Sequence, residues 1–545
     1  MQKYLFLLFA TCLCNLSFGQ TNQVEFGKNR VQYHDDFDDW LMYESYNFIT
    51  YWYGKGRNIG ESVVLMAEQD YGGIQNVLEH RMNDKIEIIV YTDITDLKQS
   101  NIGSEEAFVN SGGQTKIVGN KIFVHFDGNH NNLRRQIREG IASVYLNAML
   151  FGANLQEIVQ NAVMMNLPRW FKDGLISYVG EEWNTELDNR LRDVILHENF
   201  EDFEDIAEKY PKLAGHALWY YIGQNYGKST VSNLLYLTRI NRSVESGFLY
   251  VLGSSYNRTL ESWMMYFRQR YKTEAKGLAE ITGEFIKIKN KRKLPLSQVK
   301  ISPDGKRIAY VANEIGKYKV YIQDLQTNER EIIIKGGFRN AFQATDYNYP
   351  LLAWNPNNLE LGIILEKRDV IKTVQYDLIT KKKVTDFLDP QYDRIYSIDY
   401  INTGKLVLSA QVNGYSDIFT YTFATRQTAR ITNDFWDDLN ASFVKIHGQN
   451  GILFSSNRQD VILERNNLDS ILPTNTFDLF YYSFDKRSNE LVRVTNTPLA
   501  NEWKATQVDS AWFTYISDAS GIFNRQSGYL EDFVAYYEKT YHLND

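Results

Sequence analysis

The sequence predicts a multidomain protein in which an α+β domain is followed by an all-β propeller. Two observations lead to this fold class. Between residues 131 and 272, apolar residues recur at a spacing of three to four, which is typical of helices. From Leu294 onward, short alternating strands with turn signals replace the helical pattern and repeat along the chain. The basic stretch KIKNKRK (287–293) separates the two textures and is interpreted as a solvated linker.

The first domain is expected over residues 20–285. The runs KIEIIVYTD (85–93) and KIFVHFDG (121–128) predict strands, and residues 61–82 show helical spacing. The stretch RRQIREGIASVYLNAML (134–150) predicts an amphipathic helix that carries Glu139 on one face. Further helices are expected downstream, among them NLQEIVQNAVMM (154–165), with Gly227 and Gly253 at positions where helices can end.

The second domain is expected over residues 295–545, after a linker at 286–294. Each repeat pairs a polar turn with an alternating strand, as in SPDGKRIAYVAN (302–313), and strand starts recur at roughly 45–60 residues. That interval is the scale of a four-stranded propeller blade. Four full units and part of a fifth are found, with an insertion at 459–476. We expect that these units do not close a ring by themselves. Either other elements complete the ring or the chain is a fragment of a longer protein, and the second interpretation is favoured.

The first 19 residues resemble a secretory signal peptide. Lys3 precedes an apolar run that is too short to span a bilayer, and small residues favour cleavage before Gln20. Both cysteines, Cys12 and Cys14, lie inside this segment, and neither follows the small residue that a lipoprotein signal needs. The mature chain is therefore expected to be soluble, without disulfides, thiolate nucleophiles or cysteine zinc sites.

Composition narrows the classes of function. The formal net charge is −8 and no long basic run is present, which makes nucleic acid an improbable partner. No stretch after the signal segment is apolar enough to span a bilayer, so the chain is not expected to be an integral membrane protein.

Two family resemblances follow from these motifs. SPDG at 302–305, FSSNR at 454–458 and the repeated units resemble the PD40 (WD40-like) repeats of TolB-like propellers. Residues 36–272 resemble the peptidase MA-like, or gluzincin-like, domains of secreted bacterial proteins. That second resemblance rests on the order of the two strands and the helix, followed by P-x-W-F-x-x-G at 168–174.

The resemblance places a zinc-peptidase motif on four residues of this chain, here called the motif positions. Glu139 takes the place of the general base, while the ligand positions hold Arg138, Ala142 and Asp173. Arginine is a cation without an acceptor, and alanine has no donor atom. A catalytic zinc ion needs three protein ligands, so we expect no metal, no cofactor and no catalysis here. An ion-paired cluster of Arg138 with Glu139 and Asp173 is expected in place of the metal.

Other residues offer no stronger catalytic set. The eight histidines are His34, His80, His125, His130, His197, His216, His447 and His542. His125 and His130 are close enough in sequence to approach Glu139, although a strand histidine and a loop histidine are the simpler interpretation. His216 is expected to be a packed core residue. The aromatic residues of DPQYD (389–393) and NDFWDD (433–438) fit either a recognition rim or packing between blades.

Three hypotheses about function remain. The first is a secreted, non-catalytic scaffold of the cell envelope, similar to Bacteroidota proteins, that binds a protein or peptide partner in the periplasm or at the outer membrane. The second is a divergent zinc metallopeptidase whose site is rebuilt from His125 or His130 with Glu139 and Asp173. The third is a carbohydrate-binding or glycan-processing protein, which the abundant aromatic residues permit, although no carboxylate pair stands out.

Overall fold

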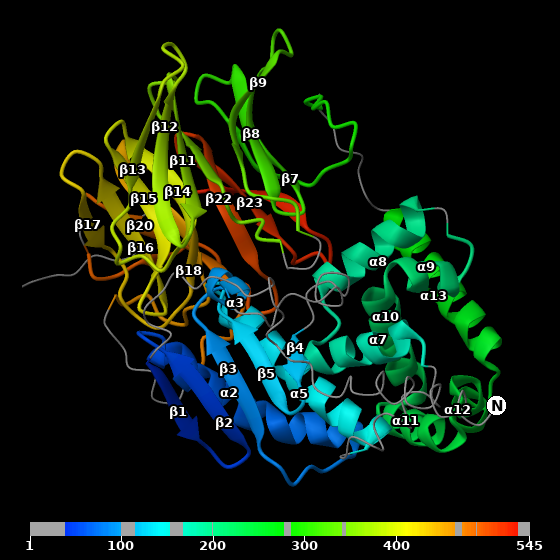
Figure 1. Cartoon of the computed structure of the whole chain (residues 1–545). Coiled ribbons are helices and arrows are strands. Elements are labelled where there is room, and N and C mark those ends of the chain that lie inside the picture. The colour runs from blue at the N-terminus through cyan, green and yellow to red at the C-terminus, as the bar shows by residue number, and fades with distance from the viewer. Residues whose placement is uncertain are drawn as a thin grey trace, which may run out of the picture.

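The computed structural model describes the chain in two parts that lie against each other (Figure 1). A sheet with helices forms the N-terminal part, and antiparallel sheets form the C-terminal part. The described residues are 39–99, 115–152, 167–198, 200–276, 285–340, 345–463, 471–486 and 488–531. The signal segment and the predicted helix at 154–165 lie outside these residues. Within them, no helix has the length and apolar character needed to cross a bilayer.

A mixed five-stranded sheet organises the N-terminal part, in the order β1-β2-β3-β5-β4. The pairings β2–β3 and β3–β5 are parallel, which brings the ends of β3 and β5 to the same edge. Both predicted strands are confirmed as β3 and β5. The strands are β1 (Trp40–Glu44), β2 (Phe48–Tyr53), β3 (Ile86–Tyr91), β4 (Lys116–Val118) and β5 (Lys121–His125).

Helices α2 (Arg57–Leu78) and α5 (His130–Phe151) pack on this sheet and on each other. Both match helices that the periodicity predicts. The other helices are α3 (Ile94–Gln99), α7 (Arg169–Gly180), α8 (Thr185–His197), α9 (Phe203–Lys209), α10 (Pro211–Tyr226), α11 (Ser229–Asn241), α12 (Val244–Leu252) and α13 (Tyr256–Ala275). Gly227 and Gly253 follow the ends of α10 and α12, as predicted.

Helix α7 crosses α10 at very short range, which fixes the position of the helical layer on α5. A Cβ atom on Gly215 would lie 2.0 Å from the carbonyl oxygen of Trp170, and one on Gly174 would lie 2.3 Å from the backbone of Gly215. Only glycine allows two backbones to approach this closely. The crossing holds the end of α7 beside α5, where Val179 and Gly180 contact Arg138.

The C-terminal part is a five-bladed propeller, which confirms the predicted architecture. Among the described residues, four blades have four strands and the last has three, each in sequential antiparallel order. Blade 1 is β6 (Leu296–Ile301), β7 (Arg307–Glu314), β8 (Lys317–Asp324) and β9 (Arg330–Gly336). Blade 2 is β10 (Leu351–Trp354), β11 (Glu360–Lys367), β12 (Val370–Asp377) and β13 (Lys383–Phe387).

The remaining blades continue this pattern. Blade 3 is β14 (Arg394–Asn402), β15 (Lys405–Val412), β16 (Tyr415–Thr422) and β17 (Gln427–Arg430). Blade 4 is β18 (Asp438–Ile446), β19 (Gln449–Ser456), β20 (Asp478–Ser483) and β21 (Val492–Arg493). Blade 5 is β22 (Glu502–Asp509), β23 (Trp512–Ser517) and β24 (Asn524–Tyr529).

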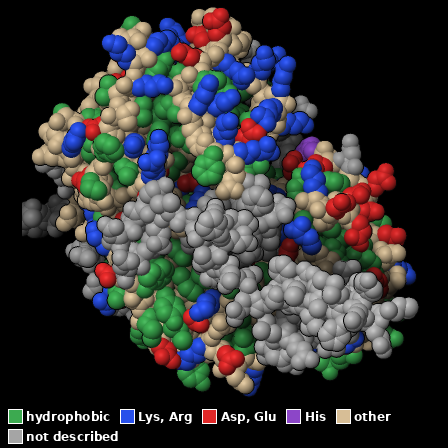
Figure 2. Space-filling view, in the orientation of Figure 1, with side chains coloured by type: hydrophobic (Ala, Val, Ile, Leu, Met, Phe, Trp, Pro, Cys, Tyr) green, Lys and Arg blue, Asp and Glu red, His purple; other side chains and the backbone are tan. Residues whose placement is uncertain are grey.

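The first strands of successive blades contact one another from β6 through β10, β14 and β18 to β22. Among the described residues, no contact of comparable extent joins β22 back to β6. The linker covers part of blade 1, where Ile288 and Leu294 pack beside Tyr310 and Tyr321. Figure 2 shows lysine and arginine side chains over the upper part of the propeller and acidic side chains over the helices at the right.

Blades 3 and 4 share a polar latch that explains part of the sequence repeat. In blade 3, Arg430 donates to Asp417 and to the carbonyl of Thr432, and the Thr432 hydroxyl lies 3.1 Å from Asp417. The same hydroxyl accepts the N–H of Ile418 at 2.9 Å. Blade 4 repeats this arrangement with Asp478, Arg493, Thr495 and Leu479. The latch joins the third strand of each blade to the segment of the fourth.

Candidate binding cleft between the two domains

The motif positions lie on α5 and α7, close to the propeller. Arg138 donates to Asp70 of α2 at 2.9 Å, to the carbonyl of Gly180 at 3.0 Å and to that of Val179 at 2.7 Å. One turn earlier, Arg134 binds the same Asp70 with two bonds of 2.7 Å. The buried Asp70 carboxylate therefore serves two guanidinium groups.

Glu139 is almost fully buried, with 1% exposure, and accepts a bond from Lys212 of α10 at 2.7 Å. A Cβ atom on Gly180 would lie 2.4 Å from its Cγ, so the last residue of α7 must be small to admit this side chain. The predicted ion-paired cluster of Arg138 with Glu139 and Asp173 is therefore wrong. Arg138 pairs with Asp70 and Glu139 pairs with Lys212, because α2 and α10 bring those charges closer.

Ala142 is buried in the main apolar core, and Asp173 is half-buried on α7, where its charge acts on Lys172. The four motif positions thus supply two carboxylates, one guanidinium and one methyl group. This donor set does not fit a catalytic zinc ion, which needs three protein ligands and one open position. The guanidinium of Arg138 is hydrogen-bonded where a histidine ligand would be needed.

The two nearby histidines contact the propeller or lie beside it. His130 contacts Asp437 in the loop before β18, with 2.6 Å between Nδ1 and Oδ1. Burial, together with the positive charges of Arg394 and Lys98, lowers the pKa of His125 to about 3. His216 is fully buried, as predicted, and its Nδ1 lies 2.9 Å from the hydroxyl of Ser177.

The other histidines lie away from the motif positions. His197 pairs with Asp193 on the exposed face of α8, and His447 contacts the carbonyl of Leu530. Burial lowers the pKa of His80, which lies beside Tyr145. His34 and His542 are outside the described residues.

The two domains meet at the shared edge of β3 and β5. The side chain of Gln411 donates to the carbonyl of Thr92 at 3.1 Å, and Asn131 donates to the carbonyl of Asn475 at 3.0 Å. Gly128 lies against the ring of Tyr396, so that a Cβ atom would come within 2.6 Å of it. Polar contacts therefore join the N-terminal domain to blades 3 and 4.

Arg394, the first residue of β14, is the centre of a buried group of charges at this interface. Its guanidinium lies 2.7 Å from Asp346 and 3.8 Å from Glu366. Burial and the negative charge of Asp93 raise the pKa of Glu366 to about 8, although the positive charge of Arg394 opposes both effects. Since Asp93 follows β3, this electrostatic interaction crosses the domain interface.

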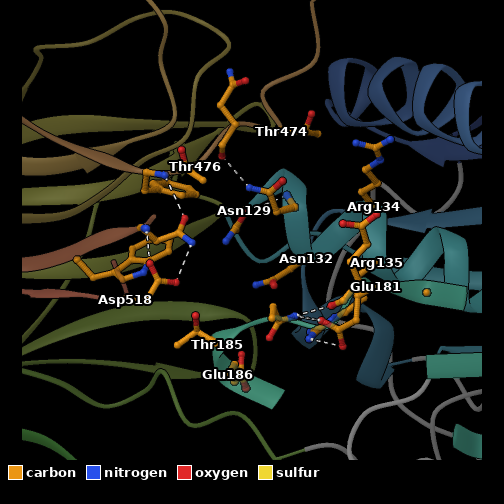
Figure 3. A pocket seen from close by; sticks show the side chains of 18 of the residues that line it. Asn129, Asn132, Arg134, Arg135, Glu181, Thr185, Glu186, Thr474, Thr476 and Asp518 are labelled. Carbon is orange, nitrogen blue, oxygen red and sulfur yellow. Dashed lines mark hydrogen bonds and ion pairs between the residues drawn. The ribbon is translucent and has the colours of Figure 1, made fainter. Parts of the chain in front are cut away.

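A cleft of about 610 Å³ opens between the domains beside Arg138. Figure 3 shows Arg134, Arg135 and Glu181 on one side, with Thr476 and Asp518 on the other. The N-terminal domain contributes Asn129, Asn131, Asn132, Arg134, Arg135, Arg138, Gly180, Glu181, Glu182, Asn184, Thr185 and Glu186. The propeller contributes Thr474, Asn475, Thr476, Phe477, Asn501, Trp503, Asp518 and Phe523.

Among the described residues, one group of three carboxylates has the spacing of a metal site, namely Asp417, Asp434 and Asp438 in the propeller. Arg458 lies 3.1 Å from Asp434 and 2.7 Å from Asp438, and Arg430 pairs with Asp417. These two arginine side chains already supply positive charge to the buried carboxylates, so the group is an ion-pair network.

Sequence reasoning missed most of the cleft. The insertion at 459–476 was recognised, and its last residues, Thr474 to Thr476, form part of one wall. The aromatic residues of NDFWDD, Phe435 and Trp436, are both buried. The contact of that segment with the N-terminal domain comes from Asp437, which nothing in the sequence distinguishes from the neighbouring acidic residues.

No protein-family model matches the sequence, and no curated protein matches it. Among solved structures, TolB from Acinetobacter baumannii is similar over 44% of this chain and 55% of its own length, at 16% identity and a TM-score of 0.30. The β-propeller domain of the Trilobed protease from Pyrococcus furiosus matches 44% of this chain and 81% of its own, at 14% identity and a TM-score of 0.26.

An acylaminoacyl peptidase from Pyrococcus horikoshii matches 44% of this chain and 39% of its own, at 13% identity and a TM-score of 0.28. Likenesses at this level identify no function, and the propeller assignment rests on the order of the sheets. The fold defines a protein with an α+β domain, a five-bladed propeller and a polar cleft between them.

Proposed function

We propose that this chain is an exported, non-catalytic interaction protein of the cell envelope, whose interdomain cleft binds a peptide segment of a partner protein. A degenerate peptidase-like domain serves as the scaffold and the propeller supplies the second wall. One observation carries the proposal: Arg138 and Glu139 are held in ion pairs with Asp70 and Lys212 of the same domain, beside a cleft that both domains line.

The residues at the motif positions and around the cleft support a non-catalytic role. Arg138 and Ala142 offer no metal-ligating atom, and Glu139 is buried against Lys212. His130, one of the two histidines from which a zinc site could be rebuilt, is already engaged with Asp437. Export is proposed from the signal-like segment at residues 1–19, and a location in the periplasm or at the outer membrane is proposed from that segment together with the pairing of the two domains.

The first experiment measures zinc in the purified full chain after brief exposure to zinc and desalting, together with hydrolysis of a mixed peptide substrate. We expect far less than one zinc ion per chain and no turnover. One bound zinc ion per chain, lost on Asp173→Ala, would replace this proposal with the metallopeptidase alternative.

A second experiment tests the cleft itself. Short random peptides are selected on the wild-type chain, and the recovered peptides are then measured on Thr185→Trp, which fills the cleft. The matched control is Glu208→Trp, because Glu208 is exposed on α9 and does not line the cleft. Binding should survive in the control and be lost in Thr185→Trp. Equal binding by both variants would place the interaction elsewhere on the molecule.

A further inference from the structure

The three arginines that line the cleft differ in how many of their N–H groups form hydrogen bonds within the protein. Arg134 and Arg138 are hydrogen-bonded to Asp70 and, for Arg138, to two backbone carbonyls. Arg135 has no hydrogen bond to any described residue. Its nearest carboxylate, Glu181, lies 3.7 Å away, which is an ion pair without hydrogen-bond contact. Arg135 is thus the cleft arginine whose donors remain available.

The side chain of Arg135 is 35% exposed and lines the cleft on the α5 side (Figure 3). A guanidinium group presents several N–H donors in a planar fork that matches a carboxylate. Partial burial strengthens such a contact relative to one in open solvent. The guanidinium group of Arg135 can therefore bind both oxygens of one carboxylate at this position.

The surrounding charges support the same conclusion. Two guanidinium groups, those of Arg134 and Arg138, share the single carboxylate of Asp70, which leaves positive charge on the α5 wall. Two of the acids that line the cleft accept hydrogen bonds within the protein, Glu181 from Asn184 and Asp518 from Asn501.

The opposite wall has a different chemistry. Trp503 and Phe523 of blade 5 line it, and Phe523 is 43% exposed. Phe477 packs on Trp503 with 4.3 Å between ring centroids, which holds the indole in place. These rings provide an apolar surface across the cleft from Arg135.

The rim near the start of α8 is acidic, because Glu182 and Glu186 are both exposed there. A polyanionic ligand would be repelled by this rim, whereas a single carboxylate could reach Arg135. The cleft therefore combines one available cation with an aromatic wall and an acidic edge.

Building on the proposed function, we propose that the cleft recognises a peptide with a single carboxylate, which Arg135 binds, and with an apolar side chain that packs on Trp503 and Phe523. The carboxylate can come from an acidic side chain or from a free C-terminus. These two sources share the same chemistry, and separate peptide analogues distinguish them.

The test uses the full chain and peptides selected from a short random library. Each selected peptide is resynthesised in three forms: unchanged, with Asp or Glu replaced by the amide residue, and with an amidated C-terminus. Fluorescence anisotropy then gives the dissociation constant for wild type, Arg135→Gln and the control Arg190→Gln. Arg190 is an exposed residue of α8 outside the cleft, so its substitution removes the same charge from the same domain.

We expect one of the two carboxylate replacements to weaken binding to wild type about tenfold or more. Arg135→Gln should cause a similar loss, and the two changes together should cost little more than either alone, since they remove the same contact. Arg190→Gln should bind like wild type. Identification of the sensitive analogue assigns the source of the carboxylate.

Two results would overturn the assignment to Arg135. One is a selected peptide that binds without any carboxylate. The other is a peptide whose affinity for wild type and for Arg135→Gln falls by the same factor when its carboxylate is removed. In that case the peptide-binding function itself would stand. Failure of the wild-type chain to select any peptide would overturn both the function and the inference.

Discussion

His130 and Asp437 are 307 residues apart in sequence, yet they form a paired contact between the two domains. The Nδ1 atom of His130 lies 2.6 Å from Oδ1, and the backbone N–H of the same residue donates to Oδ2 at 2.8 Å. His130 is the first residue of α5. The contact therefore fixes the helix that carries Arg134, Arg135 and Arg138 against the propeller, and with it the width of the cleft.

Removal of this carboxylate should loosen the interface. Asp437 is fully buried and also accepts a bond from Asn457 at 2.9 Å. We expect Asp437→Ala to lower the free energy of unfolding by about 3 kcal/mol, because three buried donors lose their acceptor. Urea unfolding measures the loss, and limited proteolysis reports domain separation. Asp509→Ala, at an exposed position of β22, is the control and should change little. Unchanged stability in Asp437→Ala would show that the contact is dispensable.

The shared carboxylate of Asp70 offers a second test. In Asp70→Asn, two partly buried guanidinium groups lose their counter-charge, and we expect a loss of about 3–5 kcal/mol in the free energy of unfolding. The matched control is Glu61→Gln, also on α2, which breaks the exposed pair with Arg57. That pair should contribute less than about 1 kcal/mol. Equal effects of both substitutions in urea unfolding would contradict the structural role given to Asp70.

The buried charges around Arg394 predict a pH dependence. Burial raises the pKa of Glu366 from its ordinary value of 4.5 to about 8. Between these values the folded protein holds a proton that the unfolded chain has released, so this group makes the free energy of unfolding fall as pH rises. Glu366→Gln removes the titration. The difference in stability between the variant and wild type should therefore grow in favour of the variant from pH 4.5 to about 8.

His125 acts in the opposite direction at lower pH. Its pKa is lowered to about 3, so its contribution to stability increases as pH rises from about 3 to 6.5. Comparison of wild type with Glu366→Gln at each pH cancels this contribution. A pH-independent difference between the two proteins would contradict the raised pKa of Glu366.

The latch of blade 4 gives a further prediction. Asp478 accepts bonds from Arg493 at 2.5 Å, from the hydroxyls of Thr495 and Thr497 at 3.0 Å, and from the N–H of Thr497 at 2.9 Å. We expect Asp478→Ala to cost about 3 kcal/mol of unfolding free energy, because buried donors lose their acceptor. Hydrogen exchange should show the loss in protection concentrated in β20 and β21. Protection unchanged in these strands would contradict the latch.

Features that depend on neighbouring residues in the sequence were predicted correctly, whereas contacts between segments distant in the sequence were not. Strands β3 and β5 and helices α2 and α5 were predictable because burial on one face imposes a local period. The polar turns and alternating strands repeat along the chain, so the blades could be recognised before their strands were paired. Partners of buried charges were not predictable, since Arg138 selects Asp70 over Asp173 only after α2 packs on α5.

An α+β domain followed by a propeller can be predicted from the sequence alone, as can the lack of histidine at the motif positions. These properties depend on residue identity and local period alone. The partners that neutralise Arg138 and Glu139 depend on how the helices pack. In the same way, blades 4 and 5 form the second wall of the cleft only because of how the two domains pack. The reason is physical: a buried charge is stabilised by whatever group the packing brings within a few ångströms, and in this protein those groups lie on segments distant in sequence.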